Sequence, residues 1–485
     1  MSPSVESFNE AKYKTLMDGL ECSEVMLSKI DLGDRFDSEY FTKNYLHISE
    51  QLAKVPTKLI GKISTTVASA FYPAATQLYS IGDTAFARCV DCVNYPIISK
   101  DQDAKFEKIP YAFAAESKGI SILKNEDIII TKVGTPCYAS IITEYSEIAL
   151  SRTVLGLTNI HDIDPYYLVI FLRCKYGFEQ LFRQRELTIQ YQLTLPRVKA
   201  INVYDAGESF QKDIRKVCMK FIECAQKAKK VYDEAHSIVS TILDLPEFPQ
   251  KNISIKMKSS SFSETGRLDA EYYQSKYDDY TRAILSYANG YTYIREKFSS
   301  VKTKCDRIAK AYSYIEIGDV SVVDGSVSAN LIATENLPDN AKIMTKSGDV
   351  LVSTVRPNRG AVAILESDNY LVSGAFTVLR ESSDYPKEIL RVLLRSDLYK
   401  DWLLRYNVGT SYPVIKDDDI LNMPIPIMPK QIQTVIVEKV RESINLRNRA
   451  KEDLNNAKHA VEIAIEEGED IALEWLKEKV ELLEE

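Results

Sequence analysis

The sequence repeats itself, and this repeat constrains the fold more than any other feature of the chain. The segment Arg35-Phe-Asp-Ser-Glu-Tyr-Phe41 recurs 232 positions later as Arg267-Leu-Asp-Ala-Glu-Tyr-Tyr273. Farther on, Asn125-Glu-Asp-Ile-Ile-Ile130 matches Ser347-Gly-Asp-Val-Leu-Val352 at a shift of 222. Single residues extend the match at nearly the same shift: Ser151 with Ser373, Arg173 with Arg395, and Tyr191 with Tyr412. The chain is therefore a tandem duplication, and we expect two equivalent halves.

Each half has the same order of patterns. Short β-like runs, such as 127–131 and 349–354, are separated by turns rich in Gly, Pro, Asn and Asp. An apolar helix-like segment follows at 165–178 in the first half and at 387–404 in the second. A Pro-bearing stretch, sharpest in Met423-Pro-Ile-Pro-Ile-Met-Pro429, then leads into a long amphipathic helix. The pattern predicts a mixed α/β domain followed by a long helix, twice.

The two long helices carry narrow apolar stripes with alternating steps of four and three residues. The stripes consist of Phe221, Ala225, Ala228, Tyr232, Ala235, Val239 and Ile242 in the first helix, and of Ala450, Leu454, Ala457, Val461 and Ala464 in the second. This spacing is typical of a coiled-coil seam, and small alanines favour close approach of two helices. Short heptad patterns also arise when a helix packs on its own domain, so that alternative stays open. The duplication favours pairing, because two equivalent helices can form an antiparallel spacer.

We therefore expect an α+β protein with internal pseudo-two-fold duplication. Two mixed α/β domains, at 1–207 and 247–429, are expected to be separated by two long helices that form an antiparallel coiled coil. The first helix is expected at 208–246, and the second, with a tail, at 430–485.

Composition and charge set broad limits on the class of protein. Hydrophobic residues make up 45% of the chain, which is enough to bury several cores. The net charge is −8, but residues 1–52 and 430–485 each carry −5, so the middle is slightly positive and a nucleic-acid partner is not excluded. We expect a cytoplasmic protein without a membrane association, because no apolar run is long enough to span a bilayer and the polar N-terminus lacks a secretory pattern. The sparse cysteines, with Cys89-Val-Asp-Cys92 as the sole CxxC, fit a reducing compartment.

Motifs for catalysis are missing from the sequence. There is no Gly-rich phosphate loop, and no Asn-Pro-Pro-Tyr or Asp-Pro-Pro-Tyr tetrapeptide of the kind that holds a base for amino methylation. The four histidines are scattered, and none has metal-ligand spacing. Pro338-Asp339 with Lys342 lacks the second acidic residue that a metal-dependent nuclease would need. We expect a non-enzymatic chain that binds no metal.

Several motifs of the second half resemble those of type I restriction–modification specificity subunits. They are Arg267–Tyr273, Tyr314-Ile-Glu-Ile-Gly-Asp319, Ser347–Arg356, Gly374-Ala-Phe-Thr377, Ser411-Tyr412, and Met423-Pro-Ile-Pro-Ile427 followed by Gln431. The resemblance covers nearly the whole chain but is closest from about 262 to 450. In the first half, Lys132-Val-Gly-Thr135 replaces the Ser-Thr-Val-Arg stretch, and Gln190-Tyr-Gln-Leu193 replaces Thr-Ser-Tyr-Pro.

The resemblance implies a function. Such subunits carry two target-recognition domains, each of which reads one half of a bipartite, interrupted site in double-stranded DNA. Their helices form the spacer and dock two methyltransferase subunits, and restriction/translocase subunits join for phage defence. The chain itself would bind no cofactor, because S-adenosylmethionine, ATP and Mg belong to the partners. Two alternatives remain: the DNA-recognition subunit of a related type II system, or a non-DNA coiled-coil adaptor with two binding modules.

Candidate DNA-binding residues follow from charge and turn chemistry. In the second half, the candidates for phosphate contact are Lys302, Lys304, Arg307, Lys310 and Lys346. The Pro/Gly turn after the 349–354 run offers Arg356, Asn358 and Arg359 for base edges, with Ser411 and Tyr412 for the backbone. The corresponding first-half candidates are Lys132, Thr135, Arg152 and Gln190. The plainer alternative is a solvated turn with surface arginines. Partner docking is assigned to the seam residues of the two long helices.

Overall fold

The chain folds into two compact units. The computed structural model describes residues 9–480, except for positions 27–29, 31–34, 36, 71–74, 94, 101–102, 104–105, 118, 187–190, 244–256, 258–261, 264 and 410. Unit 1 comprises residues 1–226 and 448–485, and unit 2 comprises residues 227–447. Each unit therefore joins one half of the duplicated sequence to parts of two long helices, α9 (Glu208–Leu243) and α16 (Lys430–Glu466). No helix in the described part of the chain is long and apolar enough to cross a membrane.

Unit 1 contains two main sheets, with the strand orders β2-β10-β7-β8-β4 and β5-β3-β9-β6, and a small sheet β1-β11. Its strands are β1 (Thr57–Leu59), β2 (Thr65–Ala68), β3 (Thr84–Ala87), β4 (Ile97–Ile98), β5 (Glu107–Ile109), β6 (Ile122–Leu123), β7 (Ile128–Thr131), β8 (Ala139–Ile142), β9 (Ile148–Leu150), β10 (Val154–Thr158) and β11 (Asn202–Tyr204). Its further helices are α1 (Glu10–Leu16), α2 (Lys43–Leu52), α3 (Ile60–Ile63), α4 (Cys89–Cys92), α5 (Tyr111–Glu116), α6 (Pro165–Arg173), α7 (Lys175–Arg183), α8 (Leu195–Lys199) and α17 (Glu469–Lys479).

Unit 2 repeats this plan, with the strand orders β13-β20-β17-β18 and β15-β14-β19-β16, and a small sheet β12-β21. Its strands are β12 (Tyr291–Tyr293), β13 (Phe298–Ser300), β14 (Ala311–Ile315), β15 (Asn330–Ala333), β16 (Ala341–Met344), β17 (Val350–Ser353), β18 (Val362–Ile364), β19 (Leu371–Ser373), β20 (Phe376–Glu381) and β21 (Pro424–Pro426). Its further helices are α11 (Ser275–Leu285), α12 (Ile294–Lys297), α13 (Lys387–Arg395), α14 (Asp397–Leu403) and α15 (Asp417–Leu421).

Corresponding strands in the two units pair in the same way. β7 lies between β10 and β8, and β17 lies between β20 and β18, all antiparallel. In the second sheets, β3–β9 and β14–β19 are the equivalent parallel pairs. The central strands are rich in β-branched residues and are buried along their whole length, as expected where both faces of a strand are covered. The predicted duplication and mixed α/β fold are confirmed.

Two equivalent arginines, the half-buried Arg173 and the buried Arg395, explain one of the repeated positions. Arg173 ends α6 and Arg395 ends α13, and both guanidinium groups donate to main-chain carbonyls. Arg173 bonds the carbonyl of Cys92 at 2.8 Å, and Arg395 bonds that of Gly360 at 2.8 Å. Burial lowers the pKa of Arg173 to about 10. A buried charge needs such partners, so this repeated arginine fastens a helix to a neighbouring loop in each unit.

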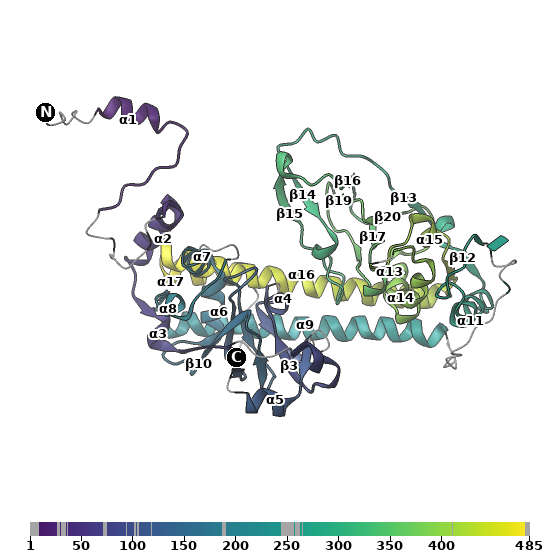
Figure 1. Cartoon of the computed structure of the whole chain (residues 1–485), viewed down its shortest axis with the longest axis horizontal. Coiled ribbons are helices and arrows are strands. Elements are labelled where there is room, and N and C mark those ends of the chain that lie inside the picture. Colours follow the sequence, from purple (N-terminus) through teal and green to yellow (C-terminus); the bar gives the residue numbers. More distant parts are fainter. Residues whose placement is uncertain are drawn as a thin grey trace. The chain divides into compact units, whose positions relative to one another are not determined.

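The long helices pack against each other inside each unit (Figure 1). In unit 2, the Ser443 hydroxyl donates to the Ala228 carbonyl at 2.7 Å, and Lys439 pairs with Glu234 at 2.5 Å. In unit 1, Lys220 Nζ lies 4.0 Å from Asp453. Residue numbers rise along α9 as they fall along α16, so the helices are antiparallel.

The seam residues contribute to the cores of the units as well as to the helix pair. The buried ones are Ala228, Tyr232, Ala235, Val239, Ala450, Leu454, Ala457, Val461 and Ala464, while Phe221, Ala225 and Ile242 are half-buried. Leu454, Ala457 and Val461 belong to the core of unit 1. Tyr232, Ala235 and Val239 belong to the core of unit 2. Helix pairing and packing on the units therefore occur together. The expected domain boundaries at 207/208 and 429/430 stay predictions, and the one at 246/247 lies outside the described residues.

Candidate functional site

A tight turn follows the central strand of the main sheet in unit 2. Residues 354–360, named the reading turn for the role that is proposed for them, leave β17 with Arg356 in the left-handed region, at φ 51° and ψ 52°. This conformation costs an L-residue about 1–2 kcal/mol, so surrounding contacts must hold it. A single 3₁₀ turn (Pro357–Arg359) follows, and Gly360 closes it at φ 74°. The side chains of Arg356, Asn358 and Arg359 are exposed, whereas Pro357 is buried.

A second segment, the 407–414 loop, supports the reading turn. Val414 pairs with Val355 in an isolated antiparallel bridge, and the Arg356 N–H donates to the Pro413 carbonyl at 2.7 Å. The Arg356 guanidinium carbon lies 5.5 Å from the centre of the exposed Tyr412 ring, a cation–π contact. A Cβ at Gly409 would lie 1.9 Å from the Tyr412 carbonyl oxygen, so only glycine fits there. The loop and the turn thus form one surface.

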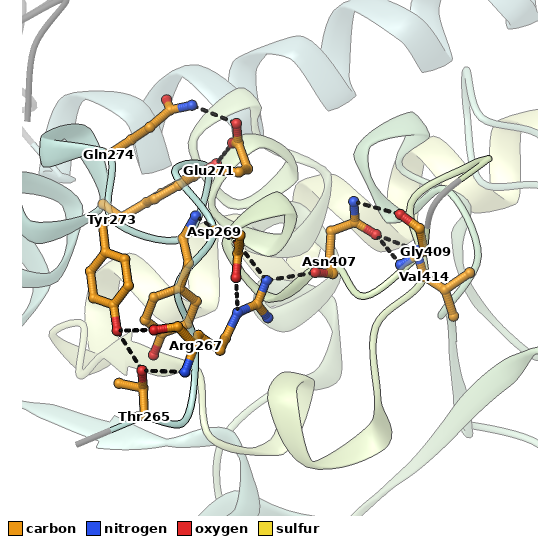
Figure 2. A network of polar contacts seen from close by, with 11 residues as sticks. Thr265, Arg267, Asp269, Glu271, Tyr273, Gln274, Asn407, Gly409 and Val414 are labelled. Atoms are coloured by element: carbon orange, nitrogen blue, oxygen red, sulfur yellow. Dashed lines mark hydrogen bonds and ion pairs between the residues drawn. The ribbon is translucent and has the colours of Figure 1, made fainter. Parts of the chain in front are cut away.

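The repeated Arg-x-Asp motif fastens this loop (Figure 2). Arg267 forms a two-pronged pair with Asp269, at 2.8 and 2.7 Å, and also donates to the Asn407 carbonyl at 2.7 Å. The Asn407 side-chain oxygen accepts the N–H groups of Gly409 at 2.8 Å and Val414 at 2.9 Å. In the sequence this motif marks the repeat and the family resemblance but no contact, and Asn407 has no recognisable signal. The structure joins all of them to the loop that contacts the reading turn.

Unit 1 contains an equivalent anchor. Arg35 pairs with Asp37 at 2.5 and 2.6 Å and donates to the carbonyl groups of Arg183 and Arg185. Beyond them, Gln192 pairs with Val133, as Val414 pairs with Val355. Gly134, at φ 94°, therefore occupies the place of Arg356.

These bridges correct one detail of the repeat. Val133↔Gln192 and Val355↔Val414 are both related by a shift of 222, so Tyr191 corresponds to Pro413. The match of Tyr191 with Tyr412 is wrong by one residue, because the sequence of this loop diverged while its pairing did not. The counterpart of Tyr412 is Gln190, a candidate that lies outside the described residues. Tyr191 instead packs against the guanidinium of Arg185, at 4.1 Å.

The remaining candidates occupy several places. Lys302, Lys304, Lys310 and Lys346 are exposed, and Lys302 lies 3.8 Å from Asp417. Lys304 pairs with Ile343, which places the basic 302–310 segment along β16. Arg307 donates to the carbonyl groups of Pro338 and Ala341 at 3.0 and 3.2 Å, and so fastens its own sheet. The other candidates are Ser411, Thr135 and Arg152, which are exposed, and Lys132, which is half-buried. The structure thus brings Arg356 and Tyr412 together, with Arg359 and Ser411 as their neighbours on the same two segments.

The Arg267–Asp269 pair should stabilise unit 2 in a pH-dependent way. The hydrogen bond from Arg267 holds the pKa of Asp269 below its ordinary value. A lowered folded-state pKa adds stability above the unfolded-state pKa, near 4, and that stability is lost as the pH falls through the folded-state value. We expect Asp269→Asn to lower the urea midpoint most at pH 7, and the difference from the wild type to shrink below about pH 4. Asp279→Asn, which removes the exposed pair with Arg282, is the control. A difference that grows on acidification would contradict this assignment.

Known proteins resemble this chain in sequence. Residues 294–457 match the family described as the type I restriction modification DNA specificity domain. The type I restriction enzyme MjaVIII specificity subunit of Methanocaldococcus jannaschii is 25% identical over 176 residues, which are 34% of this chain and 40% of that protein. The type I restriction enzyme HindI specificity subunit of Haemophilus influenzae is 25% identical over 157 residues, 30% of this chain and 34% of that one. The matched segments thus span less than half of each relative.

A solved structure, the type I restriction-modification system S subunit from M. genitalium, aligns with 87% of this chain and 95% of its own. Its sequence identity is 10% and its TM-score is 0.38. An alignment with this TM-score supports no conclusion about the fold, which rests on the strands and helices of this chain.

Proposed function

We propose that this chain, which belongs to the type I restriction–modification specificity subunits, reads DNA for its complex. One observation carries the proposal. Unit 2 presents Arg356, Asn358 and Arg359 on a tight exposed turn that the fold holds against the cost of a left-handed arginine. Strained backbone with exposed polar side chains is typical of binding sites.

The chemistry of the reading turn suits the major groove. A guanidinium donates two parallel hydrogen bonds to guanine, and an asparagine amide pairs in the same way with adenine. Arg356 and Arg359 are proposed for guanine edges, and Asn358 for adenine. The exposed Lys302, Lys304, Lys310 and Lys346 are proposed for phosphates, which position the protein without reading sequence. Since Arg307 is bonded to carbonyl groups of its own sheet, we assign it a smaller part.

The duplication supports a bipartite target. Each unit has its own turn at the same place in the fold, so each is proposed to read one half of an interrupted site. Two linked readers bind far more tightly than either alone, because the second contact is intramolecular. The residues at the equivalent place differ, Arg356 against Gly134, as they must if the two half-sites differ.

The chain is proposed to supply sequence specificity, and its partner subunits are proposed to carry out the methylation and restriction reactions. Two methyltransferase subunits would dock along the paired helices, one for each repeat, and restriction/translocase subunits would complete the complex. S-adenosylmethionine, ATP and Mg are assigned to those partners. This chain is proposed to act without a catalytic site of its own, in the cytoplasm, where its DNA target lies.

The test is a comparison of DNA methylation with and without this chain. Single-molecule sequencing of genomic DNA should show one bipartite motif, methylated on adenine in each half, that disappears when the gene is deleted and returns with the full-length gene. The measurement uses the intact complex in the cell. An unchanged pattern of methylation after deletion would contradict the proposal and favour an adaptor outside DNA modification.

A further inference from the structure

Three segments that are far apart in the sequence contact one another in unit 2. The Arg267–Tyr273 motif bonds the 407–414 loop (Figure 2), and that loop bonds the reading turn. We propose that Arg267 and Asp269 are positioning residues for DNA readout: they hold the loop, and the loop holds the reading turn. This inference rests on the proposed DNA-reading function and assigns a role to residues outside the reading turn.

The first step is the anchor. Asp269 accepts two hydrogen bonds from Arg267, so the guanidinium is fixed in one orientation. The same guanidinium also donates a hydrogen bond to the Asn407 carbonyl at 2.7 Å. The Arg267 guanidinium also lies over the Tyr272 ring, at 4.7 Å, which limits its motion further.

The second step is the loop. With its carbonyl anchored, Asn407 turns its side-chain oxygen to the N–H groups of Gly409 and Val414, at 2.8 and 2.9 Å. The Val408 N–H adds a bond to the Val414 carbonyl at 2.9 Å. These bonds close the loop on itself, and the Tyr412 side chain in it is exposed.

The third step is the transfer to the turn. Pro413 accepts the N–H of Arg356, and the Ile415 N–H donates to the Thr354 carbonyl at 2.9 Å. These two hydrogen bonds, one on each side of Val355, therefore fix the backbone from which Arg356 projects. Reading a base edge requires placement to within about half an ångström, so movement of the loop would degrade readout before it degraded binding.

The repeat provides independent support. Unit 1 keeps the Arg35–Asp37 pair, the bonds to the carbonyl groups of Arg183 and Arg185, and the Val133↔Gln192 bridge. It does not keep the side chain on the turn, which is Gly134. The anchor is the same in both units although the side chain on the turn differs. We therefore infer that the anchor holds the backbone geometry that the two turns share, rather than one particular contact.

The experiment is a double-mutant cycle on the full chain in complex with its methyltransferase subunits. Binding is measured by fluorescence anisotropy on the selected duplex and on duplexes that change one base pair at a time. The variants are Asp269→Asn, Arg356→Ala and both together. Arg282→Lys perturbs an exposed Arg–Asp pair of 3.0 Å in the same unit and is the matched control. Arg267→Lys keeps a charge beside Asp269 but cannot make the fork and the carbonyl bond together.

If the proposal holds, Asp269→Asn lowers discrimination about tenfold at the position that Arg356 reads, within the range for one bidentate contact. Preference at the other half-site and the salt dependence stay unchanged. In the Arg356→Ala background, Asp269→Asn has no further effect on discrimination at that position, because there it acts through the Arg356 side chain. Arg267→Lys gives an intermediate loss, and it replaces Asp269→Asn in the cycle if the latter does not fold. Arg282→Lys changes nothing.

Other results overturn the inference. If Asp269→Asn weakens binding to all duplexes equally, the pair has a role in folding alone. The same conclusion follows if Asp269→Asn lowers discrimination equally in the wild type and in the Arg356→Ala background. An unchanged motif after Arg356→Ala shows that the turn is not the reader, and the inference fails with it. A wild-type complex without any sequence preference contradicts the proposed function itself, which distinguishes that failure from the failure of the positioning role.

Discussion

Arg356→Ala should relax base preference at one or two positions of one half-site and leave the other half-site unchanged. A bidentate contact to a base contributes about 1–3 kcal/mol of discrimination, so preference at that position should fall by about 5- to 150-fold. Selection from randomised duplexes by the complete complex measures this directly.

Phosphate-binding residues behave differently: Lys302→Ala or Lys304→Ala should weaken binding to all sequences and lower the salt slope by about one unit for each phosphate that is no longer neutralised.

Arg356→Gly separates readout from folding. Glycine adopts the left-handed conformation without strain, and unit 1 has Gly134 at the equivalent place. This variant should therefore lose the same preference as Arg356→Ala while its melting temperature stays equal to, or above, that of the wild type. If Arg356→Ala and Arg359→Ala both leave the selected motif unchanged, the turn is not the reading element.

Lengthening both long helices by seven residues should widen the gap between the half-sites by about three base pairs. Seven residues add about 10.5 Å of helix at 1.5 Å each, and one base pair spans about 3.4 Å of duplex. Seven residues make nearly two full turns of helix, so the insertion keeps the apolar seam on the same face of each helix. The insertions belong after Gln226 and after Arg447, where the two compact units divide. Selection with randomised gap lengths measures the outcome, and each half-site should stay unchanged.

The insertion must be matched because α9 and α16 are in register. The Ser443–Ala228 hydrogen bond and the Lys439–Glu234 pair fix that register in unit 2. Seven residues in α9 alone would offset the buried alanines, so that variant should lose thermal stability and bind poorly at every gap length. A matched insertion that binds the original gap would show that the helices do not set the spacing.

Much of the fold could be predicted from local patterns. The buried run 128–131 and its repeat 350–353 form the central strands, and the apolar segments at 165–178 and 387–404 form α6, α7, α13 and α14. Tyr191 shows the limit of this approach, because divergence within the loop concealed a one-residue error that only strand pairing corrected.

The sequence by itself determined the duplication, the order of strands and helices, the seam of the long helices and the family resemblance. All of these depend on periodicity or on repetition of side chains, which are properties of the chain read in order. Only the tertiary structure decided what the repeated arginine does. Arg267 bonds a carbonyl group 140 residues away. Every residue has a main-chain carbonyl, so no pattern of side chains identifies that acceptor, and the folded backbone alone brings it within reach.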